Sequence, residues 1–480
     1  MSAAAKAIAA QGLARRALSL GAVKAFDHAL QFLLPVVLVR CLDAHTFGEY
    51  RLLWLAIGTV MALAPFGMPG ALYYFMPRSD EPTRRLYVHQ TMGFLALTGL
   101  LAAFIVSPLN PWMPAALAPL MKYGALVPVF VTLWVVTVLL DFLPTIEERI
   151  PLQAYANISL AAARALLVAG AAWLTADLGV ILWLLLAVVV LKLGLLVAYI
   201  QRFHGWKRPW FKRSVFRGQI AYTAPFGVSS ACYVLRGQAD QWVAASLFTL
   251  HSFAAFSIAA ILGQVVNMFR QSVVEAFMPS MSRMEAAGQL KSMMEMNARA
   301  NAMVGMLLFP LLGFVFAFAE DIVTLVYTAE YVEAAPVMRV CVIGMLALVV
   351  ELNSVLQLLR QGMFNLGLSV VVLAVSVPLS LLGGVQLGLA GAAIGSAIAL
   401  YLDRIIVLRR IAAISGVPIR EQQHWASLAR HLAWTVIATV GAWLVGHHLF
   451  AATPIIVRLA MGGAVLAAVY GAVNWKQLRT

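Results

Sequence analysis

Long apolar runs, separated by short polar segments or by Pro and Gly, make up almost the whole chain. A helix of about 20 apolar residues is long enough to cross the hydrocarbon core of a membrane. The pattern predicts fourteen spanning helices, at 17–39, 50–73, 86–107, 121–143, 152–175, 178–200, 219–248, 253–276, 300–324, 336–359, 366–385, 390–408, 431–449 and 455–473. The predicted fold class is therefore an all-α polytopic membrane protein.

Basic residues gather on one predicted side of the membrane. The chain has 34 Lys and Arg against 20 Asp and Glu, a formal net charge of +14, and is 62% hydrophobic. The basic loops contain Arg78, Arg84, Arg85, Lys207, Arg208, Lys212, Arg213, Arg217, Arg409, Arg410, Arg420 and Arg430. By the positive-inside rule, these loops and both termini are cytosolic. The positive charge thus indicates topology, and no nucleic-acid partner is expected.

An internal repeat divides the chain into two similar halves. The tripeptide Phe-Met-Pro closes the second predicted span at 75–77 and the eighth at 277–279. Upstream of these copies, the sequence FGEY at 47–50 aligns with FAAF at 253–256. Six spans per half is an even number, so the halves share one orientation and are related by an axis along the membrane normal.

The repeat predicts two pseudo-symmetric six-helix lobes followed by two additional helices. The expected parts are a cytosolic basic amphipathic N-terminus at 1–16, a first lobe at 17–200, a basic cytosolic linker at 201–218, a second lobe at 219–408, a cytosolic linker at 409–430, and two C-terminal helices with a tail at 431–480.

Polar residues recur at helical spacing on three spans, so that each set shares one helix face. The sets are Lys24, Asp27, His28 and Gln31 on the first span, Ser229, Tyr233, Arg236 and Asp240 on the seventh, and Gln264, Asn267, Gln271 and Glu275 on the eighth. Charges inside a membrane are costly and mark substrate or ion pathways. These faces predict the lining of a central cavity, and the cations Lys24 and Arg236 favour an anionic ligand.

Two interpretations of these cations stay open. Lys24 with Asp27, and Arg236 with Asp240, can each form an ion pair within one helix that only neutralises charge. Alternatively, both cations face a cavity. The repeat then places Arg236 about six residues beyond Lys24 on the equivalent helix, about 9 Å further along the membrane normal. Two cations at different depths suit a charged headgroup that moves across the membrane.

Among the other charged residues inside predicted spans, three have specific alternatives. Arg164 fits a cavity lining or a bridge between helices equally well. Lys192 lies about two turns from a cytosolic helix end, where its side chain can reach toward water, which favours a structural role. Glu351 is either a site that binds a proton or a partner for Arg164.

The sequence lacks the motifs of the common catalytic sites. We find no GxxxxGK[ST] phosphate loop, no HExxH and no GxSxG. The three Cys residues are far apart and form no CxxC, so no structural zinc site is indicated. We expect no enzymatic activity, no cofactor and no metal, although H⁺ or Na⁺ coupling through Asp27, Asp240 or Glu351 is compatible with the pattern.

Several stretches resemble the MOP superfamily of exporters, and within it the Wzx-like polysaccharide flippases. They are FGEY at 47–50, ALYYFMPR at 71–78, Ala239-Asp240, FMPSMS at 277–282 and GLAGAA at 388–393, and the resemblance covers about residues 12–412. It implies two six-helix lobes that work by alternating access, with the first, second, seventh and eighth spans lining the cavity.

The resemblance also implies a substrate and a place in the cell. The substrate is an oligosaccharide on polyprenyl diphosphate, turned from the cytosolic to the periplasmic leaflet of a bacterial inner membrane for O-antigen, capsule or exopolysaccharide synthesis. The expected partners are this lipid-linked oligosaccharide, membrane lipid, and assembly proteins such as a polymerase and a chain-length regulator. Lys24 and Arg236 would receive the diphosphate, with Arg51 and Arg270 at the cavity mouths.

One alternative comes from the same superfamily. An acidic residue on the first span, here Asp27, is typical of the cation-coupled multidrug exporters of the MATE branch. The basic residues on the same helix faces, and the two additional C-terminal helices, favour the flippase over the drug exporter.

Overall fold

The computed structural model describes residues 29–30 and 32–478. Most of the first predicted span lies outside them, including Lys24, Asp27, His28 and Gln31. The described residues form helices and no strand, and ten helices are long and apolar enough to cross a membrane. The all-α membrane fold is therefore confirmed, while the count of fourteen spans stays a prediction.

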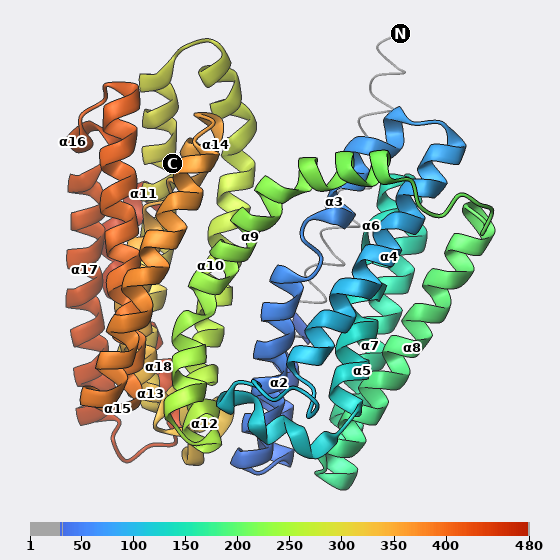
Figure 1. The fold of residues 1–480 in the computed structure, drawn as a ribbon. Helices are drawn as coiled ribbons and strands as arrows, with labels where there is room; N and C mark the ends of the chain where they lie inside the picture. The colour runs from blue at the N-terminus through green and yellow to red at the C-terminus, as the bar shows by residue number, and fades with distance from the viewer. Residues whose placement is uncertain (1–28, 31, 479–480) are drawn as a thin grey trace. The chain divides into compact units, whose positions relative to one another are not determined.

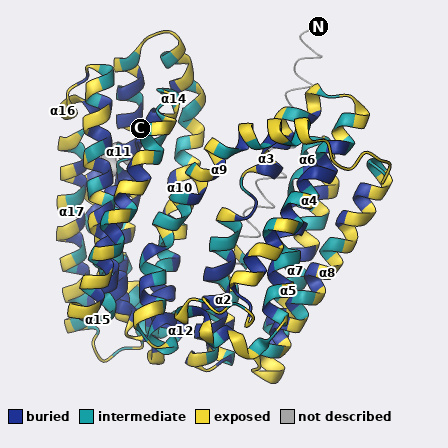
Figure 2. Cartoon of the chain, viewed as in Figure 1, coloured by how far each residue is buried: buried dark blue, intermediate teal, exposed yellow. Residues whose placement is uncertain are grey.

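The chain divides into two compact units, Met1–Val234 and Leu235–Thr480 (Figure 1). The N-terminal unit contains a short helix at Phe32–Cys41, followed by α2 (Ala44–Leu63), α3 (Met68–Phe75), η1 (Met76–Arg78), α4 (Glu81–Ile105), η2 (Ala115–Tyr123), α5 (Leu126–Thr137), α6 (Leu139–Ile146), α7 (Ile150–Thr175) and α8 (Leu178–Phe203). The core between α4, α5 and α8 includes the fully buried Leu95, Val135 and Leu196. Buried faces alternate with exposed faces along these helices, as expected for spans packed on one side (Figure 2).

The C-terminal unit contains both the remaining spans and the two additional helices. Its elements are α10 (Leu250–Ala286), α11 (Leu290–Ala317), α12 (Ala319–Tyr327), η3 (Ala329–Tyr331), α13 (Ala334–Leu346), η4 (Ala347–Val349), α14 (Asn353–Leu358), α15 (Gly362–Ser415), α16 (Ile419–Gln422), α17 (Trp425–Leu444), η5 (Val445–Leu449) and α18 (Ile455–Leu478). The additional helices pack against α11 and α12 around the buried ring of Phe318. They are thus part of this unit's core.

The boundary between the units falls inside α9 (Arg213–Leu247), whereas the sequence suggested the linker at 201–218. The first half of α9 packs on α3 and α4. Gln219 donates a hydrogen bond to Thr91 at 3.3 Å, and a side chain at Gly227 would lie 2.8 Å from the Phe66 carbonyl oxygen. These contacts hold this half of the helix in the N-terminal unit.

Two predicted spans are interrupted. The expected helix at 50–73 breaks between α2 and α3, where Phe66 and Gly67 have φ of 47° and 73°. The expected helix at 336–359 breaks between η4 and α14, around Glu351. The spans predicted at 366–385 and 390–408 meet at Gly388, whose φ of 70° and ψ of −154° separate the two halves of α15. Glycine reaches this conformation without a steric penalty.

The aligned starts of the repeat have the same local structure. Asp43 accepts a hydrogen bond from the backbone N–H of Thr46 at the start of α2, and Thr249 does the same for Ser252 at the start of α10. Each cap stands four residues before the aligned Phe, at position 47 or 253. The second tripeptide copy differs from expectation, because Phe277 lies within α10, which continues to Ala286.

Candidate functional site

Arg236 forms an ion pair between two helices of the C-terminal unit. Its Nη1 lies 2.6 Å from Oδ1 of Asp403, on the second half of α15. Asp403 is almost fully buried. The neighbouring acid on α9, Asp240, accepts hydrogen bonds from the backbone N–H of Gln241 at 2.8 Å and from Ser396. The structure thus places Arg236 against an acid on a different helix, an arrangement that the sequence alternatives did not include.

Glu351 occupies the break between η4 and α14 and is 4% exposed. Its carboxylate pairs with Arg270 of α10 and accepts a hydrogen bond from the backbone N–H of Ser354 at 3.1 Å. The Asn297 and Asn301 amides each donate to the Glu351 backbone carbonyl at 3.1 Å. At the helix break, the Glu351 backbone carbonyl therefore accepts the hydrogen bonds of two amides. The Glu351 carboxylate holds Arg270 inside the unit. Arg270 is buried, whereas the resemblance implied a place at a cavity mouth.

Arg404 completes a cluster of five charged side chains, which we call the arginine cluster: Arg236, Arg270, Arg404, Asp403 and Glu351. Arg404 is 5% exposed, lies 3.7 Å from Asp403 and interacts electrostatically with the other members. Four buried atoms of the cluster have no hydrogen-bond partner among the described residues: Arg270 Nε, Asp403 Oδ2, Arg404 Nε and Arg404 Nη1. Three cations against two carboxylates leave a formal charge of +1 on these side chains.

The polar face predicted for the eighth span is exposed on α10. Gln264, Asn267 and Gln271 are all exposed, and Gln271 donates a hydrogen bond to Glu275 at 3.0 Å. Asn267 also accepts a hydrogen bond from Arg270 at 3.0 Å, which links this face to the arginine cluster. Tyr233 on α9 is 46% exposed.

The predicted cations of the N-terminal unit have other surroundings. Lys192 of α8 lies 2.8 Å from the Asp141 carboxylate of α6. Arg164 of α7 lies over the rings of Trp54 and Trp134, at 5.7 and 5.9 Å from the ring centroids. Such contacts stabilise a cation away from water by cation–π attraction. Arg51 is half-buried on α2.

The sequence interpretation did not single out Asp403 and Arg404 as site residues. Both lie within the predicted span at 390–408, between the apolar residues Leu402 and Ile405. Two adjacent opposite charges at a helix end suggest an interfacial pair, although the structure buries both. The signal that favours burial is the position of both residues inside a predicted apolar span. Among the described residues, no three His, Cys, Asp or Glu side chains are placed to hold a metal ion.

The fold and the buried charges define a polytopic helical membrane protein built from two compact units. A family model described as "Polysaccharide biosynthesis protein" matches residues 13–285, more than half of the chain. The chain therefore belongs to the polysaccharide biosynthesis protein family. A comparison with curated proteins finds no match.

Several solved structures share the fold. The chain is similar to lipid II flippase MurJ in an inward closed conformation, with a TM-score of 0.72, 12% identity, and coverage of 95% of this chain and 99% of that chain. An inward-facing multidrug resistance MATE family transporter gives a TM-score of 0.60 at 14% identity, covering 81% of this chain and 96% of that one. A MOP superfamily transporter from Pyrococcus furiosus gives 0.54 at 13% identity, covering 83% and 96%. These likenesses show that the chain has the fold of these proteins.

Proposed function

We propose that this protein is a flippase that moves a polyprenyl-diphosphate-linked oligosaccharide from the cytosolic to the periplasmic leaflet of a bacterial inner membrane. The product would serve O-antigen, capsule or exopolysaccharide synthesis. In this proposal the protein is a secondary transporter that works by alternating access, and not an enzyme. Both termini are cytosolic, and a polymerase and a chain-length regulator act on the same glycan.

The observation that carries the proposal is the arginine cluster, in a chain that belongs to a polysaccharide biosynthesis family. Arg270 and Arg404 are buried, Arg236 is partly buried, and the three share two buried carboxylates. Because burying a charge without compensation costs several kcal/mol, a third arginine at this site is not expected of a purely structural network. Guanidinium groups bind phosphate through two parallel hydrogen bonds. Arg270 Nε and Arg404 Nη1 donate no hydrogen bond within the described residues, and donors of this type bind phosphate oxygens.

Polar surface within the spans supports the same function. Gln264, Asn267 and Gln271 are exposed on a helix that is apolar enough to span the membrane. A polar face of this kind is unfavourable against lipid and suits a water-filled cavity that receives sugar hydroxyls. In this proposal Asp240 and Glu351 are the described acids available for coupling to H⁺ or Na⁺, and Lys24 and Asp27 belong to the same pathway.

The test follows the lipid-linked saccharide in cells that lack the gene. We expect it to accumulate on the cytosolic leaflet, and the normal protein to restore export. The variant Arg236→Ala should abolish export at an unchanged protein level, and Arg236→Lys should restore part of it. The control Arg299→Ala removes an exposed arginine that pairs with Glu295 and should export normally. Unchanged glycan export together with increased drug sensitivity would instead identify a MATE-type multidrug exporter.

A further inference from the structure

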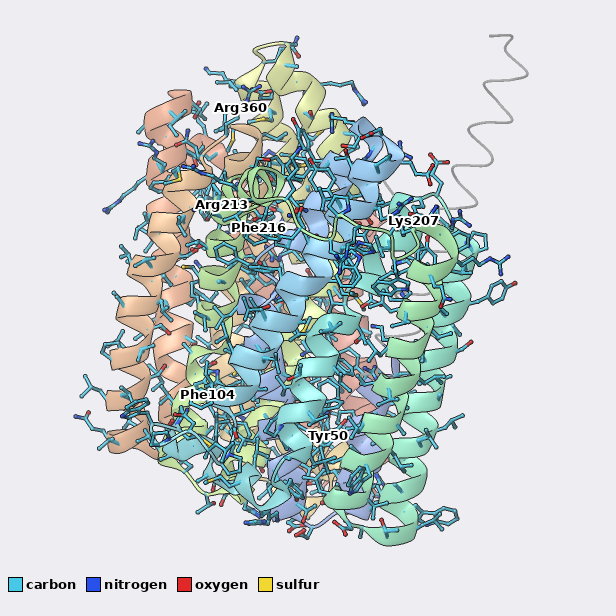
Figure 3. All side chains as sticks on the ribbon, turned by 45° about the vertical axis from the view of Figure 1, so that its right-hand side comes forward. Tyr50, Phe104, Lys207, Arg213, Phe216 and Arg360 are labelled. Carbon is cyan, nitrogen blue, oxygen red and sulfur yellow. The ribbon has the colours of Figure 1, made fainter. Side chains whose placement is uncertain are left out.

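A strongly basic and aromatic segment, residues 204–217, joins the end of α8 to the start of α9. Its exposed side chains are Trp206, Lys207, Arg208, Trp210, Phe211, Lys212, Arg213 and Arg217. No Asp or Glu occurs between 201 and 218. Figure 3 labels Lys207 in the loop, and Arg213 and Phe216 on the first turn of α9. The segment therefore presents five cations and three large aromatic rings together.

Two buried residues of α4 hold this segment in shape. The His89 Nε2 hydrogen bonds to the Gly205 carbonyl at 3.0 Å, and its ring stacks on Trp206 at 5.3 Å with an interplanar angle of 2°. Gln90 donates to the Lys212 carbonyl at 2.9 Å. Within the loop, the Trp210 indole donates to the Trp206 carbonyl at 2.9 Å. A surface that is fixed at both ends loses little conformational entropy when it binds a partner.

The position of the segment limits what it can meet. It follows directly after Phe203, the last residue of the apolar span α8, and so lies at the level of the lipid headgroups. Trp and Phe rings are favourable at this level. Each Lys or Arg near an acidic membrane surface strengthens association about fivefold. The positive-inside rule accounts for the cations of this segment. It does not account for the aromatic rings or for the hydrogen bonds and ring stacking from α4.

We propose that residues 204–217 form a docking surface for the headgroups of acidic phospholipids in the bilayer. Lys207, Arg208, Lys212, Arg213 and Arg217 bind the phosphates, and the rings of Trp206, Trp210 and Phe211 insert beside them. This surface is separate from the arginine cluster and does not depend on which substrate the protein carries.

The experiment uses the full-length protein in liposomes that contain photoactivatable phosphatidylglycerol or phosphatidylcholine. Crosslinks are mapped by peptide mass spectrometry. We expect phosphatidylglycerol to label 204–217 more strongly than phosphatidylcholine does, and K207Q/R208Q to reduce this labelling about 25-fold, since each cation contributes about fivefold. The control K291Q/R409Q removes the same charge from exposed positions of the C-terminal unit and should leave the labelling of 204–217 unchanged.

A titration of the unchanged protein with NaCl keeps the test independent of any variant that fails to fold. Raising salt from about 50 to 500 mM should weaken labelling by phosphatidylglycerol only, because it screens charges at the surface. Equal labelling by both lipids would overturn the proposal, and so would an equal loss in the control variant. Displacement by soluble pyrophosphate at millimolar concentration would also overturn it, since the surface would then collect free phosphates instead of lipid.

Discussion

Replacing Asp403 with Asn tests whether the arginine cluster is held together by its carboxylates. Asp403 is 1% exposed and lies 2.6 Å from Arg236 and 3.7 Å from Arg404. The substitution keeps the size of the side chain and removes one negative charge. The formal charge of the cluster then rises from +1 to +2 in a buried site, and two arginines lose their common partner.

The expected loss can be estimated from the geometry. Removing one partner of a buried ion pair costs about 3–5 kcal/mol. The lower end applies here, because the Asn side-chain oxygen can still accept one hydrogen bond from Arg236. The melting temperature of a domain of roughly 150–250 residues falls by about 2–4 °C per kcal/mol. A C-terminal unit that unfolds cooperatively should therefore melt about 6–12 °C lower.

The assay is thermal unfolding of the purified protein in detergent, followed by size-exclusion chromatography after heating. The exposed control Glu330→Gln removes the same charge from a surface acid and should change the melting temperature by little. The double variant R236Q/D403N should recover part of the loss, since it removes a cation together with its partner. If Asp403→Asn melts with the unchanged protein, or if the two substitutions are simply additive, the pairing does not stabilise the cluster.

Three further predictions concern packing, pH and the N-terminal unit. In thermal unfolding, Gly395→Ala should lower the melting temperature, because its Cβ would lie 2.4 Å from the backbone nitrogen of Ser380, whereas Gly441→Ala has open space and should not. Burial raises the pKa of Glu147, but hydrogen bonds from His204 and Tyr199 lower it more, so the net pKa lies below its ordinary value. The stability from this carboxylate is present above the ordinary pKa and is lost as pH falls through the lowered one. Glu147→Gln should therefore melt below the unchanged protein at neutral pH. The difference between the two melting temperatures should shrink as the pH falls below about 4.5, because the unchanged protein then loses the stabilising carboxylate. Lys192→Met should lower the melting temperature, because the Asp141 carboxylate loses its ion-pair partner. A melting temperature equal to that of the unchanged protein would contradict a structural role for Lys192.

Much of the fold follows from sequence periodicity. The apolar runs predicted the helices from α4 to α8 within a few residues, because a long apolar run bounded by charge or Pro has few alternatives to a spanning helix. The repeat also predicted that 47–50 and 253–256 occupy matching places, and both lie in the first turns of helices with matching side-chain caps. Local chemistry determines these features, so local sequence reveals them.

The interruptions of the spans were not predictable from hydropathy. Pro65, Gly67, Pro69 and Gly70 surround the break at Phe66–Gly67 and are residues that interrupt helices, whereas the apolar residues that precede Glu351 give no such signal. Glu351 stabilises its own break through Ser354, and Asn297 and Asn301 of α11 satisfy its backbone. A helix break in a membrane requires such partners from distant sequence. Because the partners lie about 50 residues away, a pattern along one segment does not contain the answer.

The partner of Arg236 illustrates the same limit. Asp240 lies one turn away and is the obvious choice by helical spacing, yet Arg236 contacts Asp403, 167 residues later. Helical spacing shows which charged residues share a face of one helix, but not which other helix packs against that face. The distinction matters for function, because a pair between neighbours on one helix only neutralises charge, whereas a pair between α9 and α15 ties two helices together.

The two units differ in how their charged side chains are balanced. In the N-terminal unit, two partly buried cations are balanced singly, with Lys192 against Asp141 and Arg164 against two indole rings. In the C-terminal unit, three arginines share two carboxylates. If the charged positions served only to pack the helices, we would expect the two units to have similar charged positions. An excess cation in one copy costs stability there, and that cost is understandable if the C-terminal unit holds the anionic part of a ligand.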